Sequence, residues 1–179
     1  MMKNFSRDKA TKRVTLLGAL VNSLLSVFQI SFGLLFHSNA LIMDGIHSFS
    51  DLFTDLFVLL MTKIGGAKPD ENHPYGHGRF ETMGVVVLGS ALITLAILLG
   101  WRNLERLLGE EELLTPGGWA LAVPFAAIVS KELLYRHTHK VGKRINSAII
   151  MANAWHHRSD ALSSVVVFIG VGLASFGLP

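Results

Sequence analysis

Residues 41–60, LIMDGIHSFSDLFTDLFVLL, form a stretch with the length of a membrane-spanning helix, yet four of its side chains are ionisable. Twenty helical residues rise about 30 Å, which is the thickness of a bilayer core. An ionisable group at the centre of a bilayer costs about 2.5–3.5 kcal/mol on insertion scales. The four are spaced 3, 4 and 4 residues apart, on one face of a helix: Asp44, His47, Asp51 and Asp55. We therefore expect this face to point into a helical bundle.

The composition of the whole chain agrees with a membrane protein. Half of the 179 residues are hydrophobic and 16% are charged, whereas soluble domains carry about 25% charge. The chain has no cysteine, which excludes disulfides and thiolate metal sites. A metal must therefore be held by His and carboxylate groups, as zinc, iron(II), manganese or cobalt can be. The pI near 9.4 reflects basic residues at the ends of apolar segments, so we expect no nucleic-acid partner.

Five apolar segments are long enough to cross a bilayer, which predicts an all-α membrane protein built as a bundle of five transmembrane helices. The fourth is short and contains Pro124, and the fifth is longer than a bilayer requires. We divide the chain into a basic cytoplasmic N-terminus, residues 1–13, and a transmembrane domain, residues 14–179, that we expect to be incomplete at its C-terminus. The five predicted spans are residues 14–36, 40–61, 83–101, 117–135 and 145–178.

The distribution of basic residues predicts the orientation. One side carries most of them: Lys3, Arg7, Lys9, Lys12, Arg13, Lys63, Lys68, Arg79, Lys131, Arg136, Lys140, Lys143 and Arg144. The other side has fewer, offset by acidic residues: Arg102, Arg106, Glu105, Glu110, Glu111 and Glu112. By the positive-inside rule the N-terminus is cytoplasmic. The end, Gly177-Leu178-Pro179, then lies on the outer face, and we interpret the chain as a fragment.

The fifth span repeats the pattern of the second in AWHHRSDALSS, where His156 and Asp160 form another HxxxD pair. The two spans run in opposite directions. At 1.5 Å per residue, His47 and Asp51 lie about 12–18 Å below the outer surface, and His156 and Asp160 lie roughly 15–21 Å above the cytoplasmic end. In a bilayer core about 30 Å thick these depths overlap. Two imidazoles and two carboxylates at one level can form a tetrahedral site, which suits zinc. A single intramembrane His or Asp can simply bond a neighbouring helix, but two matched pairs favour a metal site of His47, Asp51, His156 and Asp160.

The sequence indicates the roles of the other polar residues in these two spans less specifically. Asp44 can form a local hydrogen bond or cap, and Asp55 can serve a water-filled path. We expect His157 and Arg158 to point away from the HxxxD pair, with Arg158 toward water or an acidic partner.

The connection between the second and third spans, PDENHPYGHGRFET, is rich in Pro and Gly, which argues against a continuous helix. It contains Asp70, His73 and His77, three ligands within eight residues, enough for a tight loop to wrap one ion. The alternative is a solvated polar loop. Glu71 and Glu81 are possible additional ligands. We expect His137 and His139, in the next cytoplasmic loop, to be plain surface residues.

MDGIHSFSD, NHPYGHGRFE and NAWHHRSDALSS together make the chain resemble the cation diffusion facilitator, or cation efflux, family of divalent metal transporters. The resemblance implies a transport site of the four HxxxD residues and a looser loop site of Asp70, His73 and His77. It also implies a homodimer in the membrane that exports cytoplasmic metal in exchange for protons, and no enzymatic activity. Pairs of His and Asp on both helices are similar to family members that favour zinc, while Fe2+, Cd2+, Co2+ and Mn2+ stay open. Members typically have six spans and a cytoplasmic domain, so the resemblance implies that the sixth span and that domain are missing from residues 1–179.

The coupling to protons also follows from the side chains themselves. Imidazole binds metal only when deprotonated, so protons arriving from an acidic outer side compete with the ion. The expected location is the inner (plasma) membrane of a bacterium. Alternatives are a membrane haem protein with His47 and His156 as axial ligands, a metal-binding membrane protein without transport, a membrane zinc hydrolase and a proton channel.

Overall fold

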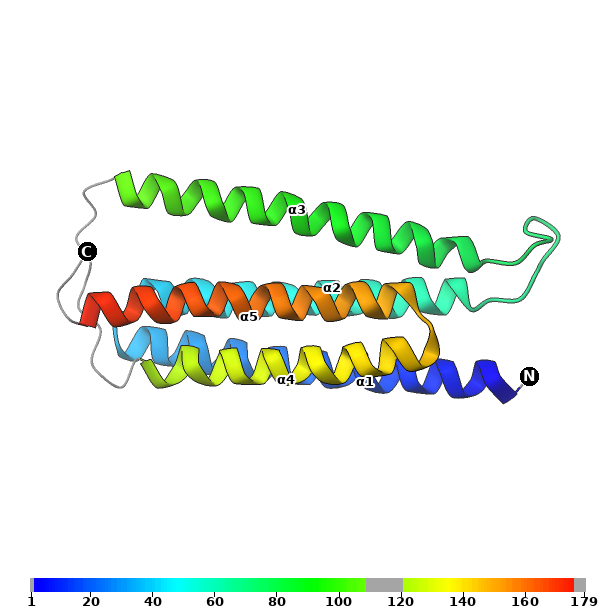
Figure 1. Cartoon of the computed structure of the whole chain (residues 1–179), viewed down its shortest axis with the longest axis horizontal. Helices are drawn as coiled ribbons and strands as arrows, with labels where there is room; N and C mark the ends of the chain where they lie inside the picture. Colours follow the sequence, from blue (N-terminus) through cyan, green and yellow to red (C-terminus); the bar gives the residue numbers. More distant parts are fainter. Residues whose placement is uncertain (1, 109–120, 176–179) are drawn as a thin grey trace.

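The computed structural model describes residues 2–108 and 121–175 and contains five long helices that lie side by side (Figure 1). No strand occurs in the described residues, so the predicted all-α bundle of five helices is confirmed. The helices are α1 (Met2–Leu35), α2 (Asn39–Gly65), α3 (Gly78–Leu108), α4 (Ala122–Ile145) and α5 (Ala148–Ser175).

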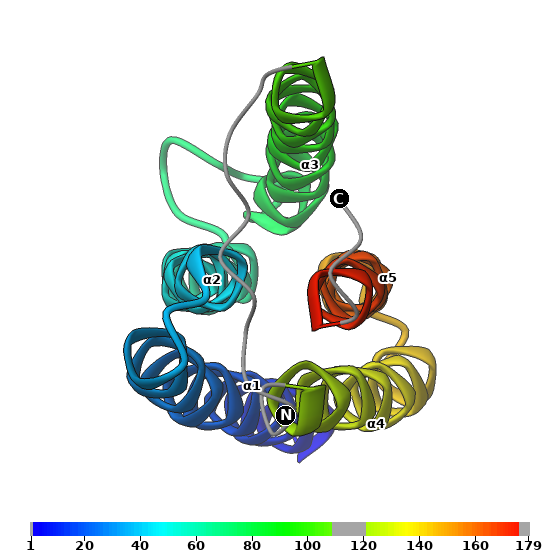
Figure 2. The same cartoon turned by 90° about the vertical axis from the view of Figure 1, so that its left-hand side faces the viewer.

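The arrangement of the helices places α2 and α5 in the middle of the bundle. Viewed along the helix axes, α1 and α4 lie on one side of this pair and α3 lies on the other side (Figure 2). The most extensive packing is between α1 and α2 and between α4 and α5; α2 also contacts α5, and α3 contacts both. The two helices that carry the HxxxD pairs therefore face each other.

The interior of the bundle contains many polar side chains beside two small apolar clusters, and many large apolar side chains lie on its outer surface. On α1 the buried positions form a stripe of polar residues at helical spacing: Thr11, Thr15, Asn22, Ser26 and Gln29. Large apolar residues of the same helix, such as Leu20 and Val27, are exposed. Lipid is as apolar as leucine, so membrane helices associate through small and polar side chains rather than through burial of apolar ones. This distribution is typical of a bundle that lies in lipid.

Close contact between α1 and α2 depends on two glycines. A Cβ at Gly33 would lie 2.8 Å from the backbone nitrogen of Ile42, and a Cβ at Gly45 would lie 2.9 Å from that of Ile30. Both distances are shorter than van der Waals contact, so only glycine allows the two backbones to approach this closely. Small residues at helix crossings have this role in membrane proteins.

Two of the five helices are apolar enough along a sufficient length to cross a membrane by composition alone: residues Arg7–Leu35 and Gly78–Leu98. The helices that carry the HxxxD pairs, α2 and α5, are not among these two. The membrane assignment of the whole bundle therefore depends on its apolar outer surface and on the family described below.

The structure corrects two predicted boundaries. Helix α4 continues to Ile145 instead of ending at Tyr135, so His137 and His139 lie on a helix and not in a loop. The helix ends at Asn146, whose left-handed backbone (φ 51°) separates it from α5. A search for twenty apolar residues stops too early because this half of α4 is amphipathic. The basic residues of the N-terminus, in contrast, already belong to α1.

Some predictions lie outside the described residues. They concern the start of the fourth span, the acidic cluster and the C-terminal residues: Gly117, Glu110, Glu111, Glu112, Gly177, Leu178 and Pro179.

Candidate metal site

The ionisable stripe of α2 faces the interior, as the spacing predicted. Asp44, Asp51 and Asp55 are at most 5% exposed, and the side chain of His47 is 17% exposed. The stripe is directed at α1 and α5 because the apolar positions of α2, such as Phe49 and Phe53, occupy the outward face.

The two HxxxD pairs meet crosswise between α2 and α5. His47 Nε2 of α2 lies 3.3 Å from Asp160 Oδ1 of α5, and His156 Nε2 of α5 lies 3.3 Å from Asp51 Oδ1 of α2. Within each helix the separations are longer, 3.9 Å from His47 Nε2 to Asp51 Oδ1 and 3.6 Å from His156 Nδ1 to Asp160 Oδ1. The structure therefore brings all four predicted residues together around one point.

The four side chains differ in how closely their ligand atoms converge. Those of His47, Asp51 and Asp160 all lie within 4.8 Å of one another. His156 joins this group through its contacts with both carboxylates. The donor set is two nitrogens and two oxygens, and zinc accepts four such ligands in a tetrahedral arrangement.

Several polar atoms of this cluster are buried without a hydrogen bond: both ring nitrogens of His156, Asp51 Oδ2 and Asp160 Oδ2. Buried polar atoms in proteins are nearly always hydrogen-bonded, since an unmet group costs about 1–3 kcal/mol. A cation between α2 and α5 could be bound by one ring nitrogen of each histidine and by the carboxylate oxygens of Asp51 and Asp160. The cluster is therefore a candidate cation site.

Lys131 of α4 also reaches this cluster, and the sequence analysis missed it. The side chain is fully buried, and its Nζ lies 3.8 Å from Asp51 Oδ2. The positive-inside pattern groups Lys131 with the basic residues at the ends of the spans, whereas the structure buries it within α4. A signal was present, because Lys131 is in phase with the small and apolar residues that form the buried face of α4: Pro124, Ala127, Leu134, Thr138 and Gly142.

A second polar cluster surrounds Asp55. Its Oδ2 accepts a hydrogen bond from Asn22 of α1 (3.3 Å), and its Oδ1 accepts one from Asn153 of α5 (3.2 Å). His157 lies next to it, with Nε2 3.4 Å from Asn153 Nδ2. These residues connect three helices. As predicted, His157 points away from the HxxxD pair, but it is buried in this cluster.

A third polar cluster surrounds Asp44. Its Oδ2 accepts hydrogen bonds from Gln29 of α1 and from Ser164 of α5 (3.4 Å). Ser48 in turn donates to Gln29 Oε1 (2.9 Å). Asp44 thus bonds neighbouring helices instead of capping its own.

Arg158 has an aromatic partner and not an acidic one. It is exposed, donates to the hydroxyl of Tyr135 (3.0 Å), and lies over the rings of Tyr135 and Trp155. The faces of aromatic rings attract a guanidinium group, so these two rings stabilise the charge of Arg158.

The predicted loop ligands also come together. Asp70 Oδ1 lies 3.2 Å from His73 Nδ1, and Asp70 Oδ2 lies 3.3 Å from His77 Nε2. The left-handed Gly76 (φ 81°) is in the turn that joins the two histidines. The backbone N–H of His73 donates to Asp70 Oδ1 (2.7 Å), and this bond, with the nearby imidazoles, holds the pKa of Asp70 below its ordinary value.

Glu81 does not belong to this loop cluster, although the sequence allowed it as a ligand. It accepts hydrogen bonds from Arg7 of α1 (2.6 Å) and from Ser147, just before α5. Its role is to tie the start of α3 to two other helices. Glu71 is exposed.

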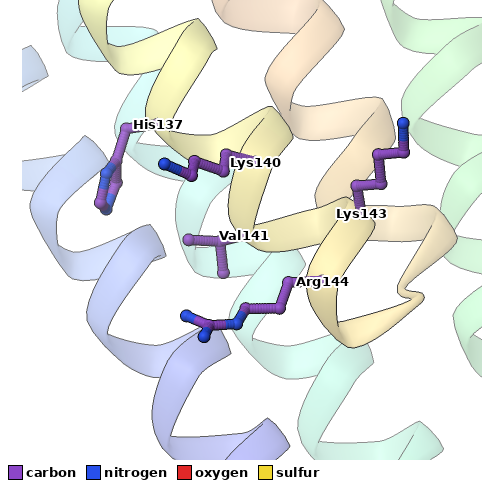
Figure 3. Close-up of a pocket in the computed structure, with 5 residues that line it drawn as sticks. All are labelled: His137, Lys140, Val141, Lys143 and Arg144. Carbon is purple, nitrogen blue, oxygen red and sulfur yellow. The ribbon is translucent and has the colours of Figure 1, made fainter.

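A pocket near the end of α4 is lined by none of the residues of the HxxxD cluster or of the loop cluster. It is lined by His137, Lys140, Val141, Lys143 and Arg144 (Figure 3). Lys140 and Arg144 extend to one side of α4 and Lys143 to the other. Its positive charge disfavours cations, so this pocket is not a second metal site.

Comparison with curated proteins gives relatives that are named as a transporter, a manganese efflux protein and a metal tolerance protein. An uncharacterised transporter of Methanocaldococcus jannaschii is 40% identical over 95% of this chain and 60% of its own length. The manganese efflux system protein MneP of Bacillus subtilis is 34% identical over 96% of this chain and 57% of its own length. Metal tolerance protein C1 of Arabidopsis thaliana is 35% identical over 93% of this chain and 38% of its own length. The chain thus spans at most 60% of these relatives.

A family model gives the same result for the chain itself. The cation efflux transmembrane domain matches residues 15–179, which include both HxxxD helices and the loop between α2 and α3. The names of the relatives describe transporters and not enzymes. The resemblance seen in the sequence is confirmed, and the chain belongs to the cation efflux family.

Proposed function

We propose that this chain is the membrane part of a carrier that exports a divalent metal ion, bound by His47, Asp51, His156 and Asp160. The observation that supports this most is the crosswise contact of the two HxxxD pairs, 3.3 Å in each direction. Ligands drawn from two facing helices can separate when the helices move, which a carrier needs and a structural metal site does not.

Zinc is the ion we propose first. The donor set has two imidazole nitrogens, and imidazole suits zinc, whereas manganese prefers carboxylate and water oxygens. MneP, named for manganese, and other relatives named only for metal or mitochondrial metal transport keep Mn2+, Fe2+, Co2+ and Cd2+ in the test panel.

Protons are the proposed counter-ion. His47 and His156 must lose their protons before they bind metal, so metal loading releases protons and acidification expels the metal. An N-terminus in the cytoplasm of a plasma membrane, supported by the basic ends of the helices, would expose the site to cytoplasmic metal first.

The loop cluster is proposed as a second, cytoplasmic metal site, and a homodimer as the assembly. Asp70, His73 and His77 can hold one ion near the start of α3, where it would stiffen the connection from α2. As a proposed division of the chain, residues 1–13 are the cytoplasmic end of the first helix and residues 14–179 are the transport domain.

The test is zinc flux into proteoliposomes under an imposed pH gradient, with wild type, Asp51→Ala and the control His137→Ala. His137 is exposed on α4 and outside both clusters. We expect Asp51→Ala to abolish flux and the control to retain it. Wild-type flux by the Asp51 variant would overturn the assignment of the site.

A further inference from the structure

We propose that Lys131 is a built-in counter-cation of the transport site: it pairs with Asp51 when the metal has left, and the incoming metal must displace it. This inference rests on the proposed function and adds a residue of α4 that competes with the transported ion. The consequence is that the site binds the metal with lower affinity and releases it faster.

The position of Lys131 is the first observation. Its side chain is 0% exposed, while the other Lys and Arg residues of the described α4 are exposed: Arg136, Lys140, Lys143 and Arg144. Burial of an ammonium group without strong compensation costs several kcal/mol. A buried lysine at this position therefore needs a compensating negative charge inside the bundle.

The second observation is that the positive charge of Lys131 is only partly compensated by its neighbours. Lys131 Nζ lies 3.8 Å from Asp51 Oδ2, and neither atom has a hydrogen bond. The two charges attract each other at this distance, but no hydrogen bond fixes them. Asp51 Oδ1, on the other side of the carboxylate, faces His156 at 3.3 Å. Asp51 is thus shared between α4 and α5, with one oxygen toward each.

Charge arithmetic gives the direction of the effect. With both histidines neutral, Asp51 and Asp160 contribute two negative charges and the ammonium of Lys131 contributes one positive charge, so the metal-free site has a net charge of −1. A divalent ion brings two, so the metal and the ammonium repel each other across Asp51. The long stem of lysine lets its charge move away from an incoming ion. A transported ion must be bound well enough to enter and weakly enough to leave.

A merely structural lysine predicts the opposite result. If Lys131 only held α4 against α2, its removal would loosen the site and weaken metal binding. If it competes with the metal, removal of its charge tightens binding and slows release. The sign of the change in affinity therefore separates the two roles.

The experiment is a zinc competition titration on the purified protein, with stopped-flow release of zinc to a chelator. For Lys131→Met we expect zinc to bind at least about tenfold more tightly, and to leave more slowly, because a neighbouring positive charge is gone. Lys131→Arg keeps the charge and should stay within about threefold of wild type. Lys140→Met, an exposed position on the same helix, is the matched control and should not change.

Three outcomes decide the proposal. Unchanged or weaker zinc binding by folded Lys131→Met overturns it; if that variant does not fold, Lys131→Gln, which also lacks the charge, is judged by the same criterion. Asp160→Ala, measured in the same titration, distinguishes a failure of the proposed transport site from a failure of the proposed role of Lys131. If it binds zinc as wild type does, or if wild type binds none, the transport site itself is wrong. If Asp160→Ala loses one bound zinc per chain while the Lys131 variants do not bind zinc more tightly, only the role of Lys131 is wrong.

Discussion

The intramembrane cluster and the loop cluster use the same side chains in opposite settings. His47 and Asp160, in contact between α2 and α5, are 113 residues apart in the chain, while Asp70, His73 and His77 lie within eight residues. The first cluster is buried among helices, whereas Asp70 and His73 are about half exposed. Loss of a charge is therefore expected to matter far more between the helices than in the loop, because water can replace a missing partner only in the loop.

The largest effect is expected from Asp160→Ala. Asp160 contacts both histidines of the transport site, so its loss removes one ligand and the group that orients two others. Even the loss of a residue that only orients a ligand lowers metal affinity about 10- to 100-fold, so we expect at least about 100-fold here. Isothermal titration with zinc and proteoliposome flux measure it. Flux above half of the wild-type rate would contradict the comparison.

The same substitution in the loop, Asp70→Ala, should have a smaller and different effect. We expect one bound zinc fewer per chain, with flux largely kept, because the transport ligands on α2 and α5 are untouched. Metal analysis after dialysis gives the stoichiometry, and the flux assay is the same as for Asp160→Ala. Equal loss of flux in the two variants would show that the loop is as essential as the helices.

The stability of the metal-free protein also distinguishes a buried carboxylate between the helices from an exposed carboxylate in the loop. Asp55→Asn preserves the shape of the side chain but weakens its acceptance of hydrogen bonds from Asn22 and Asn153. We expect a loss of about 1–2 kcal/mol in the free energy of unfolding, measured by thermal or denaturant unfolding in detergent. Asp70→Asn, the matched change in the loop, should leave the melting temperature unaltered. A larger decrease for Asp70→Asn would reverse the comparison.

The smallest expected effect is on the titration of Asp70 in the loop. The folded pKa of Asp70 lies below its ordinary value of 3.8, mainly because the His73 N–H bonds its carboxylate. A lowered pKa of a carboxyl group stabilises the turn at pH above 3.8 and this stabilisation is lost as the pH falls through the folded pKa. The carboxyl carbon shift of Asp70 in a pH titration by NMR should therefore have its midpoint below 3.8. A midpoint at or above that value would show that the turn is not formed.

The sequence predicted the transport cluster because charged residues are conspicuous in apolar segments. The spacing of Asp44, His47, Asp51 and Asp55 specified one face of a helix, and the second HxxxD pair specified its partner. The loop ligands could be predicted because they are close in sequence. Both sets of residues come together in the structure, while their binding of metal stays a prediction.

Other features could not be predicted because they depend on packing between helices. Lys131 looked like one more basic residue near a helix end, and only its phase with Ala127 and Leu134 distinguished it. Asn22 and Asn153 are neutral, so nothing marked them as the partners of Asp55. The extension of α4 to Ile145 was missed because hydropathy detects the part of a helix in lipid and not the part that continues beyond it.

The most direct test of the central claim is a crystal structure of the zinc-loaded protein with anomalous data collected at the zinc absorption edge. We predict an anomalous peak between α2 and α5. One nitrogen each of His47 and His156 and one oxygen each of Asp51 and Asp160 should lie about 2.0–2.2 Å from this peak. A peak confined to the loop cluster, or one between the helices from which either HxxxD pair is out of bonding distance, would contradict this prediction.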